Sequence, residues 1–314
     1  MTMVKYIELR GKNLVILLTT SALALLLLVI VIPLMIVLPH LRRQGIEVVS
    51  RHLPIPLIVN PLLNTLMTVG FSLSILPLAI VMYINDMYVS NIEDNIPIAL
   101  RALADTVASG IPLPRAIEVI ARGRYGALSL EMRNVVSQIL LGKTFEEAIQ
   151  YLSRKFPTPI IKRFVTILIE AYRSGGRVAQ VLHAAANVMS SIRAFETEKR
   201  TRLKPYVSLL YMITYIYVLV GALIVYGFVE SIETMAAKAS GFLQVAITTE
   251  EAASLLHFGL LVQCIISGAI IGKILRGRAV LGIPHMLIML STATVLYYMI
   301  LPPLVKLLIP IGAR

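Results

Sequence analysis

The chain consists of long uncharged apolar runs on either side of one long polar stretch. A helix of about 20 apolar residues crosses roughly 30 Å of hydrocarbon. The pattern therefore predicts an all-α, polytopic membrane protein with about five transmembrane helices. The five uncharged runs are 14–38, 57–84, 205–229, 252–272 and 280–302.

The first run is expected to be a retained span. The apolar core of a signal peptide has about 7–15 residues and is followed by a small-residue cleavage site. This run is longer, and residues 39–43, Pro-His-Leu-Arg-Arg, do not resemble such a site.

The polar stretch, residues 92–204, has helical periodicity. Apolar positions recur every three or four residues in its first segment, at Ile92, Ile96, Ala99, Leu103 and Val107. Five further segments repeat this spacing, and no segment alternates with period two as a half-buried strand would. We predict a cytoplasmic six-helix bundle without a β-sheet.

Turn and cap residues separate the predicted helices. Gly permits a positive φ at a helix C-terminus, and Pro suits the first turn of the next helix. Thr144 and Glu147 have the spacing of a capping box, whereas Gly268 and Gly272 form a GxxxG step that lets two helices approach closely. The turn and packing residues identified by this pattern are Gly110, Pro112, Gly142, Thr144, Glu147, Gly175, Gly176, Gly268 and Gly272.

Composition agrees with a membrane protein. Of the 314 residues 57% are hydrophobic, and the mean hydropathy is +0.82, whereas soluble domains have about 45–50% apolar residues. We expect three parts: two transmembrane helices in 1–84, the cytoplasmic bundle in 85–204, and about three transmembrane helices in 205–314.

The distribution of charge predicts an orientation. Lys and Arg near span ends mark the cytoplasmic side. Residues 86–204 hold 17 basic and 11 acidic residues, a net +6, whereas 230–251 hold 1 basic and 4 acidic, a net −3. The bundle is therefore expected inside the cell and the acidic connector outside. Arg42, Arg43 and Arg51 disagree with this orientation, because they lie in a connector that it places outside. The net charge is +12. Because the basic residues flank membrane runs, we attribute this charge to the cytoplasmic faces of the membrane protein and predict no nucleic-acid partner.

No motif for catalysis or cofactor binding is present. The sequence lacks GxxxxGK[ST], GxGxxG, HExxH and CxxC, and its single cysteine, Cys264, lies in an apolar run. We predict no enzyme activity, cofactor or metal. The span centres lack the charged residues typical of ion-coupled transporters. A secondary transporter or channel is the alternative function. A polar binding pocket lined by Asn60 and Asn64 is an alternative to a purely structural role for these two residues.

Several short motifs resemble a known family. They are LRALA at 100–104, SGIPL at 109–113, GKTFEEA at 142–148 and EAYRSGG at 170–176, the last beginning with Glu170. In this order and spacing they resemble the F domain of type II secretion systems, over about residues 92–229. The family includes platform proteins of type IV pili, Tad pili and the archaeal flagellum. The last motif and the charged run 196–202 are most similar to the archaeal and Tad-like branch.

The resemblance implies a non-enzymatic platform in the cytoplasmic membrane. Its implied partners are a hexameric secretion ATPase on the cytoplasmic side, pilin-like subunits and the lipid bilayer. The pilus-retraction branch usually carries two F domains, so a single one implies a homodimer or a paired paralogue. Seven basic turn residues are candidates for the ATPase contact, or else form a solvated basic rim: Arg122, Arg124, Lys143, Arg154, Lys155, Arg173 and Arg177.

Overall fold

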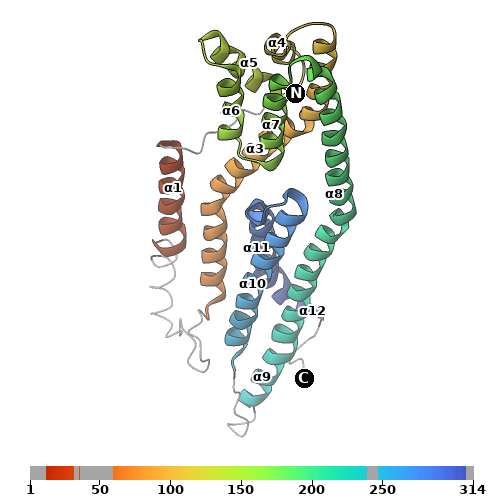
Figure 1. Ribbon diagram of the computed structural model, residues 1–314. Helices are drawn as coiled ribbons and strands as arrows, with labels where there is room; N and C mark the ends of the chain where they lie inside the picture. The colour runs from red at the N-terminus through yellow and green to blue at the C-terminus, as the bar shows by residue number, and fades with distance from the viewer. Residues whose placement is uncertain (1–11, 32–34, 36–58, 239–246, 309–314) are drawn as a thin grey trace. The chain divides into compact units, whose positions relative to one another are not determined.

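The computed structural model describes residues 12–31, 35, 59–238 and 247–308 (Figure 1). Every regular element among these residues is a helix, which confirms the predicted all-α class. The chain forms two compact units. The described residues of the first, here called the bundle, are Tyr83–Thr201; those of the second, the membrane unit, lie within Glu8–Met82 and Arg202–Arg314.

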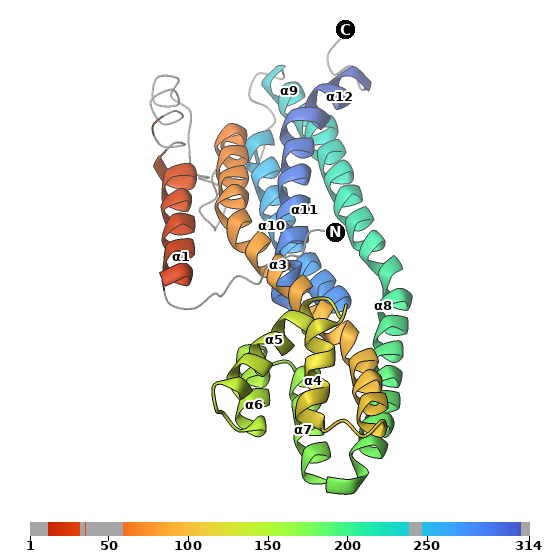
Figure 2. The same ribbon diagram turned by 90° about the horizontal axis from the view of Figure 1, so that it is seen from above.

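The bundle contains the six helices that the periodicity predicts. Figure 2 shows α4 to α7 gathered beside the bundle parts of α3 and α8. The capping box is confirmed, because Thr144 Oγ1 accepts from the Glu147 N–H and the Glu147 carboxylate accepts from the Thr144 N–H. The helices are α3 Pro61–Ala108, α4 Leu113–Arg122, α5 Ala127–Leu140, α6 Phe145–Lys155, α7 Pro159–Arg173 and α8 Val178–Ala222, with a 3₁₀ turn, η2 Gly175–Arg177, before α8.

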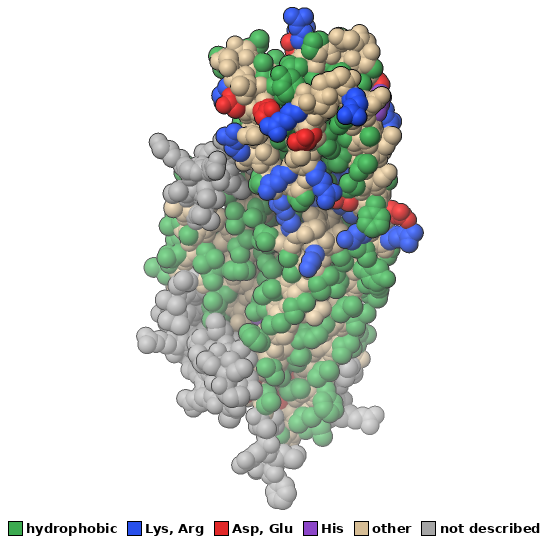
Figure 3. Space-filling model, viewed as in Figure 1, with side chains coloured by type: hydrophobic (Ala, Val, Ile, Leu, Met, Phe, Trp, Pro, Cys, Tyr) green, Lys and Arg blue, Asp and Glu red, His purple; other side chains and the backbone are tan. Residues whose placement is uncertain are grey.

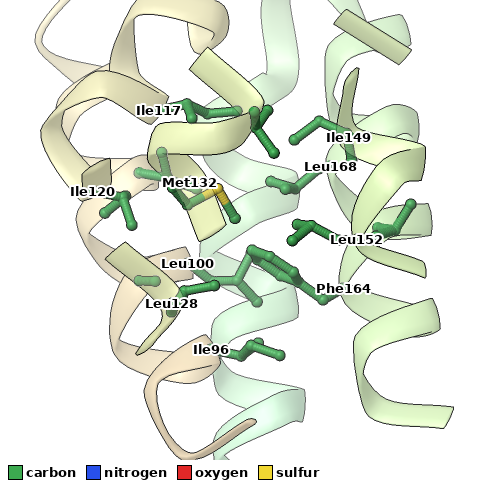
Figure 4. Close-up of a cluster of buried hydrophobic side chains, with 14 of the residues drawn as sticks. Ile96, Leu100, Ile117, Ile120, Leu128, Met132, Ile149, Leu152, Phe164 and Leu168 are labelled. Carbon is green, nitrogen blue, oxygen red and sulfur yellow. The ribbon is translucent and has the colours of Figure 1, made fainter. Parts of the chain in front are cut away.

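All six helices contribute buried side chains to the core of the bundle, and Figure 4 shows those of α3 to α7 converging. Ile96 and Leu100 of α3, Ile117 of α4, Met132 of α5 and Phe164 of α7 are all fully buried. These residues lie on the apolar faces that set the helical period in the sequence. Burying one such side chain stabilises a fold by about 1.5–3 kcal/mol.

Two helices belong to both units. α3 contains the second apolar run as well as the first bundle helix, and α8 contains the last bundle helix as well as most of the third apolar run. Pro77, Pro97 and Pro205 lie inside these helices without ending them. The change from apolar to polar residues therefore occurs within a continuous helix.

The membrane unit contains the other helices. In both views α10 and α11 lie between the membrane-unit parts of α3 and α8 (Figures 1 and 2). Four helical segments of the described chain are long and apolar enough to span a membrane, one for each of the second to fifth predicted runs. The first run is helical in α1 Lys12–Leu25 and η1 Leu26–Val31, and its remainder lies mostly outside the described residues. The other elements are η3 Leu223–Val229, α9 Glu230–Lys238, α10 Thr249–Arg276, η4 Ala279–Gly282, α11 Ile283–Val295, η5 Leu296–Ile300 and α12 Leu301–Leu308.

The GxxxG step is a close contact in the structure. A Cβ added to Gly272 would lie 2.3 Å from the backbone nitrogen of Gly282, and one added to Gly268 would lie 2.5 Å from Cβ of Met286. Real Cβ atoms do not approach other atoms this closely. Only glycine therefore lets α10 pack against η4 and the start of α11.

Polar side chains of the second span hold it against its neighbours. Asn64 Nδ2 donates to Ser254 Oγ at 3.3 Å and to the Tyr298 hydroxyl at 3.1 Å. The Asn60 side chain caps the start of α3 by accepting from the Leu63 N–H at 3.0 Å. These two asparagines serve capping and packing, because hydrogen bonds between helices satisfy polar groups that lipid cannot.

Candidate functional site

The seven predicted contact residues all lie on the bundle. On the face drawn in Figure 3, charged side chains gather over the bundle, whereas hydrophobic side chains cover the membrane unit. Cations near the C-terminal ends of helices interact favourably with the helix dipole, and several of these residues occupy such positions. Six of the seven are exposed: Arg122, Arg124, Lys143, Arg154, Arg173 and Arg177.

Lys155, the seventh, belongs to a buried network. Its Nζ donates to both carboxylate oxygens of Glu131 at 3.0 Å, and the Tyr88 hydroxyl donates to Glu131 Oε1 at 2.7 Å. The Lys155 side chain is 17% exposed and that of Glu131 is 3% exposed. Burial alone would lower the pKa of Lys155, but hydrogen bonds to Tyr151 and Glu131 hold this pKa above its ordinary value. The network joins α3, α5 and α6.

Arg173 is exposed but is also paired within the bundle. Its guanidinium donates from Nε and Nη2 to the two carboxylate oxygens of Glu146, at 2.9 and 2.8 Å. Glu170 lies 3.9 Å away on the same helix. The hydrogen bond from Arg173 holds the pKa of Glu146 below its ordinary value. This bidentate pair links α6 to α7.

The bundle also contains an ionic centre that the sequence did not reveal. Arg193 of α8 donates to Asp94 of α3 and to Glu196 at 3.0 Å, and lies 3.8 Å from Glu93. Its side chain is only 14% exposed. In the sequence, the i,i+3 spacing of Arg193 and Glu196 indicates an ion pair within one helix. The partners of Arg193 on α3 lie about 100 positions earlier in the chain, so no local pattern points to them. The centre fixes α3 against α8 in the bundle.

The other five predicted contact residues keep their charge at the surface. Arg122 pairs with Glu118 at 3.4 Å, where its side chain is 84% exposed. Within the described part of the chain, the remaining four form no ion pair: Arg124, Lys143, Arg154 and Arg177. The structure thus separates the predicted set into surface cations and two residues, Lys155 and Arg173, that hold helices together.

The predicted turn residues lie in the turns between helices. Gly142 has a φ of 88°, which favours glycine, while Gly110 and Gly175 also have positive φ. Pro112 occupies the position just before α4, and Gly176 lies in η2. These positions lie in the turns that connect the bundle helices.

A separate cavity lies at the acidic connector of the membrane unit. It has a volume of about 650 Å³, and its lining includes Tyr226, Glu230, Glu233, Thr249, Glu250 and Lys306. Lys306 Nζ lies 2.7 Å from Glu230 Oε1, and the Thr249 N–H donates to Glu233 at 3.0 Å. Thr248 and Glu251 form a second capping box, which the sequence analysis missed. Three of the lining carboxylates, Glu230, Glu233 and Glu251, therefore have partners within the unit.

The described residues contain no group of three or more His, Cys, Asp or Glu side chains that could hold a metal ion. Cys264 is a buried thiol in α10.

Comparison with known proteins relates the bundle to one family. Residues 99–226 match the family described as type II secretion system (T2SS), protein F. This match begins in α3, covers α4 to α7 and ends within η3.

A relative is an uncharacterized protein of Methanocaldococcus jannaschii. It is 27% identical over 228 residues, which are 73% of this chain and 37% of that protein. The chain thus spans less than two fifths of the length of the curated relative that it matches. No solved structure matches the chain.

Proposed function

The chain belongs to the type II secretion system protein F family through its domain at residues 99–226, and from this premise we propose that it is a platform protein for filament assembly or secretion. The platform lies in the cytoplasmic membrane and has no catalytic role. It couples a hexameric secretion ATPase on the cytoplasmic side to the insertion of pilin-like subunits. The chain acts as a homodimer or beside a paired paralogue.

One observation carries this proposal: the family match covers most of a charged bundle that shares two helices with an apolar membrane unit. α3 and α8 each contribute residues to both units. A continuous helix has all its backbone hydrogen bonds along its own axis, so it resists bending better than a loop does. These two helices are the parts of the chain that would pass a force from a soluble partner to the membrane unit.

Surface cations of the bundle provide the contact with the ATPase. Arg124, Arg154 and Arg177 are exposed and form no ion pair within the described residues, so binding breaks no ion pair of the bundle. Charge at a contact rim mainly accelerates association and selects partners. Lys155 and Arg173 instead maintain the shape of the bundle.

A binding measurement with the full chain tests this function. The chain in nanodiscs of neutral lipid is mixed with the purified hexameric secretion ATPase of the same cell, and the Kd is measured at low and high salt. Reversing Arg124, Arg154 and Arg177 to Glu should weaken binding by about tenfold at low salt and by less at high salt, because salt screens exposed charges.

The matched control reverses three other exposed cations of the bundle, Arg101, Arg115 and Lys162, to Glu. It changes the net charge equally, so an equal loss of affinity would show that only the total charge matters. Absence of binding by the wild-type chain at any salt concentration would contradict the platform function.

A further inference from the structure

The turn between α5 and α6 exposes two neighbouring leucines. Leu140 is 79% exposed and Leu141 is 83% exposed. Among the described residues they are the most exposed large hydrophobic side chains, equalled only by Leu307 of the membrane unit at 79%. A soluble surface that presents adjacent leucines in this way commonly marks an interaction site.

The local fold does not require these leucines. α5 buries Leu128, Met132 and Val135 on its core face, and Leu140 and Leu141 lie off that face. The helix ends in a Schellman motif, in which the Lys143 N–H donates to the Gln138 carbonyl and the Gly142 N–H to the Ile139 carbonyl.

An apolar contact often accompanies this motif between the residues at positions 138 and 143. Here Lys143 Nζ instead donates to Gln138 Oε1 at 2.9 Å. Leu141 is the C-cap residue of α5 through its backbone N–H, but neither leucine side chain contributes to the core or the cap, so their apolar surface is left for a partner.

The charged residue next to the leucines in the chain is basic. Lys143 follows directly, and exposed Arg133 lies about two helical turns before Leu141, with its Nε donating to the Ala121 carbonyl of α4 at 2.8 Å. Residues 132–145 contain no carboxylate. Of the flanking carboxylates, Glu131 is buried against Lys155 and Glu146 is paired with Arg173, whereas exposed Glu147 caps the start of α6 and lies near Lys143.

We infer that Leu140 and Leu141 are the apolar anchor of the bundle's contact with the secretion ATPase, an inference that rests on the proposed function. The chemistry of the partner follows from the site: a recess that accepts two leucine side chains, with carboxylates at its rim to meet Arg133 and Lys143. Interface energy concentrates in a few central apolar side chains, and the surrounding charges steer association. The leucines therefore set the lifetime of the complex, while the surface cations set its rate of formation.

Two other occupants fit the site less well. Segments that bind anionic membranes typically carry about four to eight clustered Lys or Arg, whereas this turn offers Arg133 and Lys143. A second copy of the chain would bring the same cations face to face in a twofold contact, where they repel.

The experiment compares the full chain with the double variant Leu140→Ser/Leu141→Ser, in nanodiscs of neutral lipid, for binding to the purified hexameric ATPase. The variant should bind at least about 30-fold more weakly, mainly through faster dissociation, as for a central interface residue. Its thermal unfolding should match that of the wild type, because both side chains are already in water.

The matched control is Val188→Ser/Phe195→Ser on α8, which removes two other exposed apolar side chains, 59% and 67% exposed. It should keep its affinity within about threefold. A second measurement does not depend on the double variant: Cys introduced at Leu141 should be protected from maleimide by the ATPase, and Cys introduced at Val188 should not. The native Cys264 is buried.

The outcomes separate this inference from the platform function. Wild-type binding with no effect of the serine variant would overturn the leucine anchor and leave the platform function standing. Failure of the wild type to bind would remove both. Loss of binding to anionic vesicles with unchanged ATPase affinity would assign the leucines to lipid, and conversion of a dimer to a monomer would assign them to self-association; either result overturns the inference.

Discussion

Lys155 and Arg154 are neighbours in the sequence with the same charge, yet the fold gives them different roles. Arg154 is exposed and donates to Gln150 of its own helix, whereas Lys155 is buried against Glu131. A helix turns by about 100° per residue, so adjacent side chains point in different directions. One of them faces water and the other faces α5.

Glu131→Gln should destabilise the bundle strongly. The change leaves the Lys155 ammonium largely buried beside a neutral amide, and removing one partner of a buried pair costs about 3–5 kcal/mol. The free energy of unfolding of the bundle is measured by hydrogen exchange of its core amides in the full chain. The control is Arg122→Met, which breaks an exposed pair and should cost about 0.5 kcal/mol or less. Equal effects of the two changes would contradict the structural role of Lys155.

At the scale of elements, two features hold the membrane unit together in the described residues. Small residues let α10 approach η4 and α11 closely, and polar side chains connect α3 to α10 and η5. Thr68 Oγ1 and His257 Nε2, at 3.1 Å, add a second link between α3 and α10. Because lipid offers no hydrogen bonds and little hydrophobic driving force, close packing and internal hydrogen bonds determine how these helices associate.

Gly272→Val should separate α10 from its neighbour. A Cβ at this position would lie 2.3 Å from the Gly282 nitrogen and 2.6 Å from the Ala279 carbonyl oxygen, and neither backbone atom can move aside cheaply. The buried Cys264 on α10 is the reporter: its labelling by a thiol dye should be several-fold faster in the variant.

The control for this change is Gly221→Ala, whose Cβ would meet Leu256 Cδ1 at 3.3 Å, the end of a flexible side chain. Labelling of Cys264 in this control should stay at the wild-type rate. An unchanged rate in the Gly272 variant would contradict the close contact.

At the scale of the whole molecule, the proposed coupling depends on the continuity of α3 and α8. Inserting Gly-Gly-Pro-Gly after Thr201, at the boundary of the two units in α8, should abolish filament assembly. Pro and Gly interrupt the helix, so a force from the ATPase would be absorbed at the insertion. ATPase binding itself should remain, because the bundle keeps its own core.

The same insertion after Gly110, in the turn that follows α3, is the control. That turn is open to solvent, since an added Cβ at Gly110 would meet nothing within 4 Å. Assembly is scored by electron microscopy of filaments. Normal assembly with the α8 insertion would show that coupling does not pass along this helix.

The amino-acid sequence by itself determined the helical class, the second to fifth apolar spans, the positions of the bundle helices, the Thr144 capping box and the family motifs. These features depend on residues close together in the chain, where hydrophobic period, turn chemistry and cap spacing act locally. The GxxxG step was visible as a pattern, but whether another helix approached it depended on residues elsewhere in the chain.

Only the tertiary structure decided which basic residues keep an unpaired charge at the surface and which pair with carboxylates of other helices. Lys155 meets Glu131 across 24 positions, Arg173 meets Glu146 across 27, and Arg193 meets Asp94 across 99. Such pairs form when separate helices pack, and a sequence pattern carries no record of which side chains then face each other. For the same reason the exposure of Leu140 and Leu141 could not be foreseen, because an apolar pair at a helix end looks like core until its neighbours are in place.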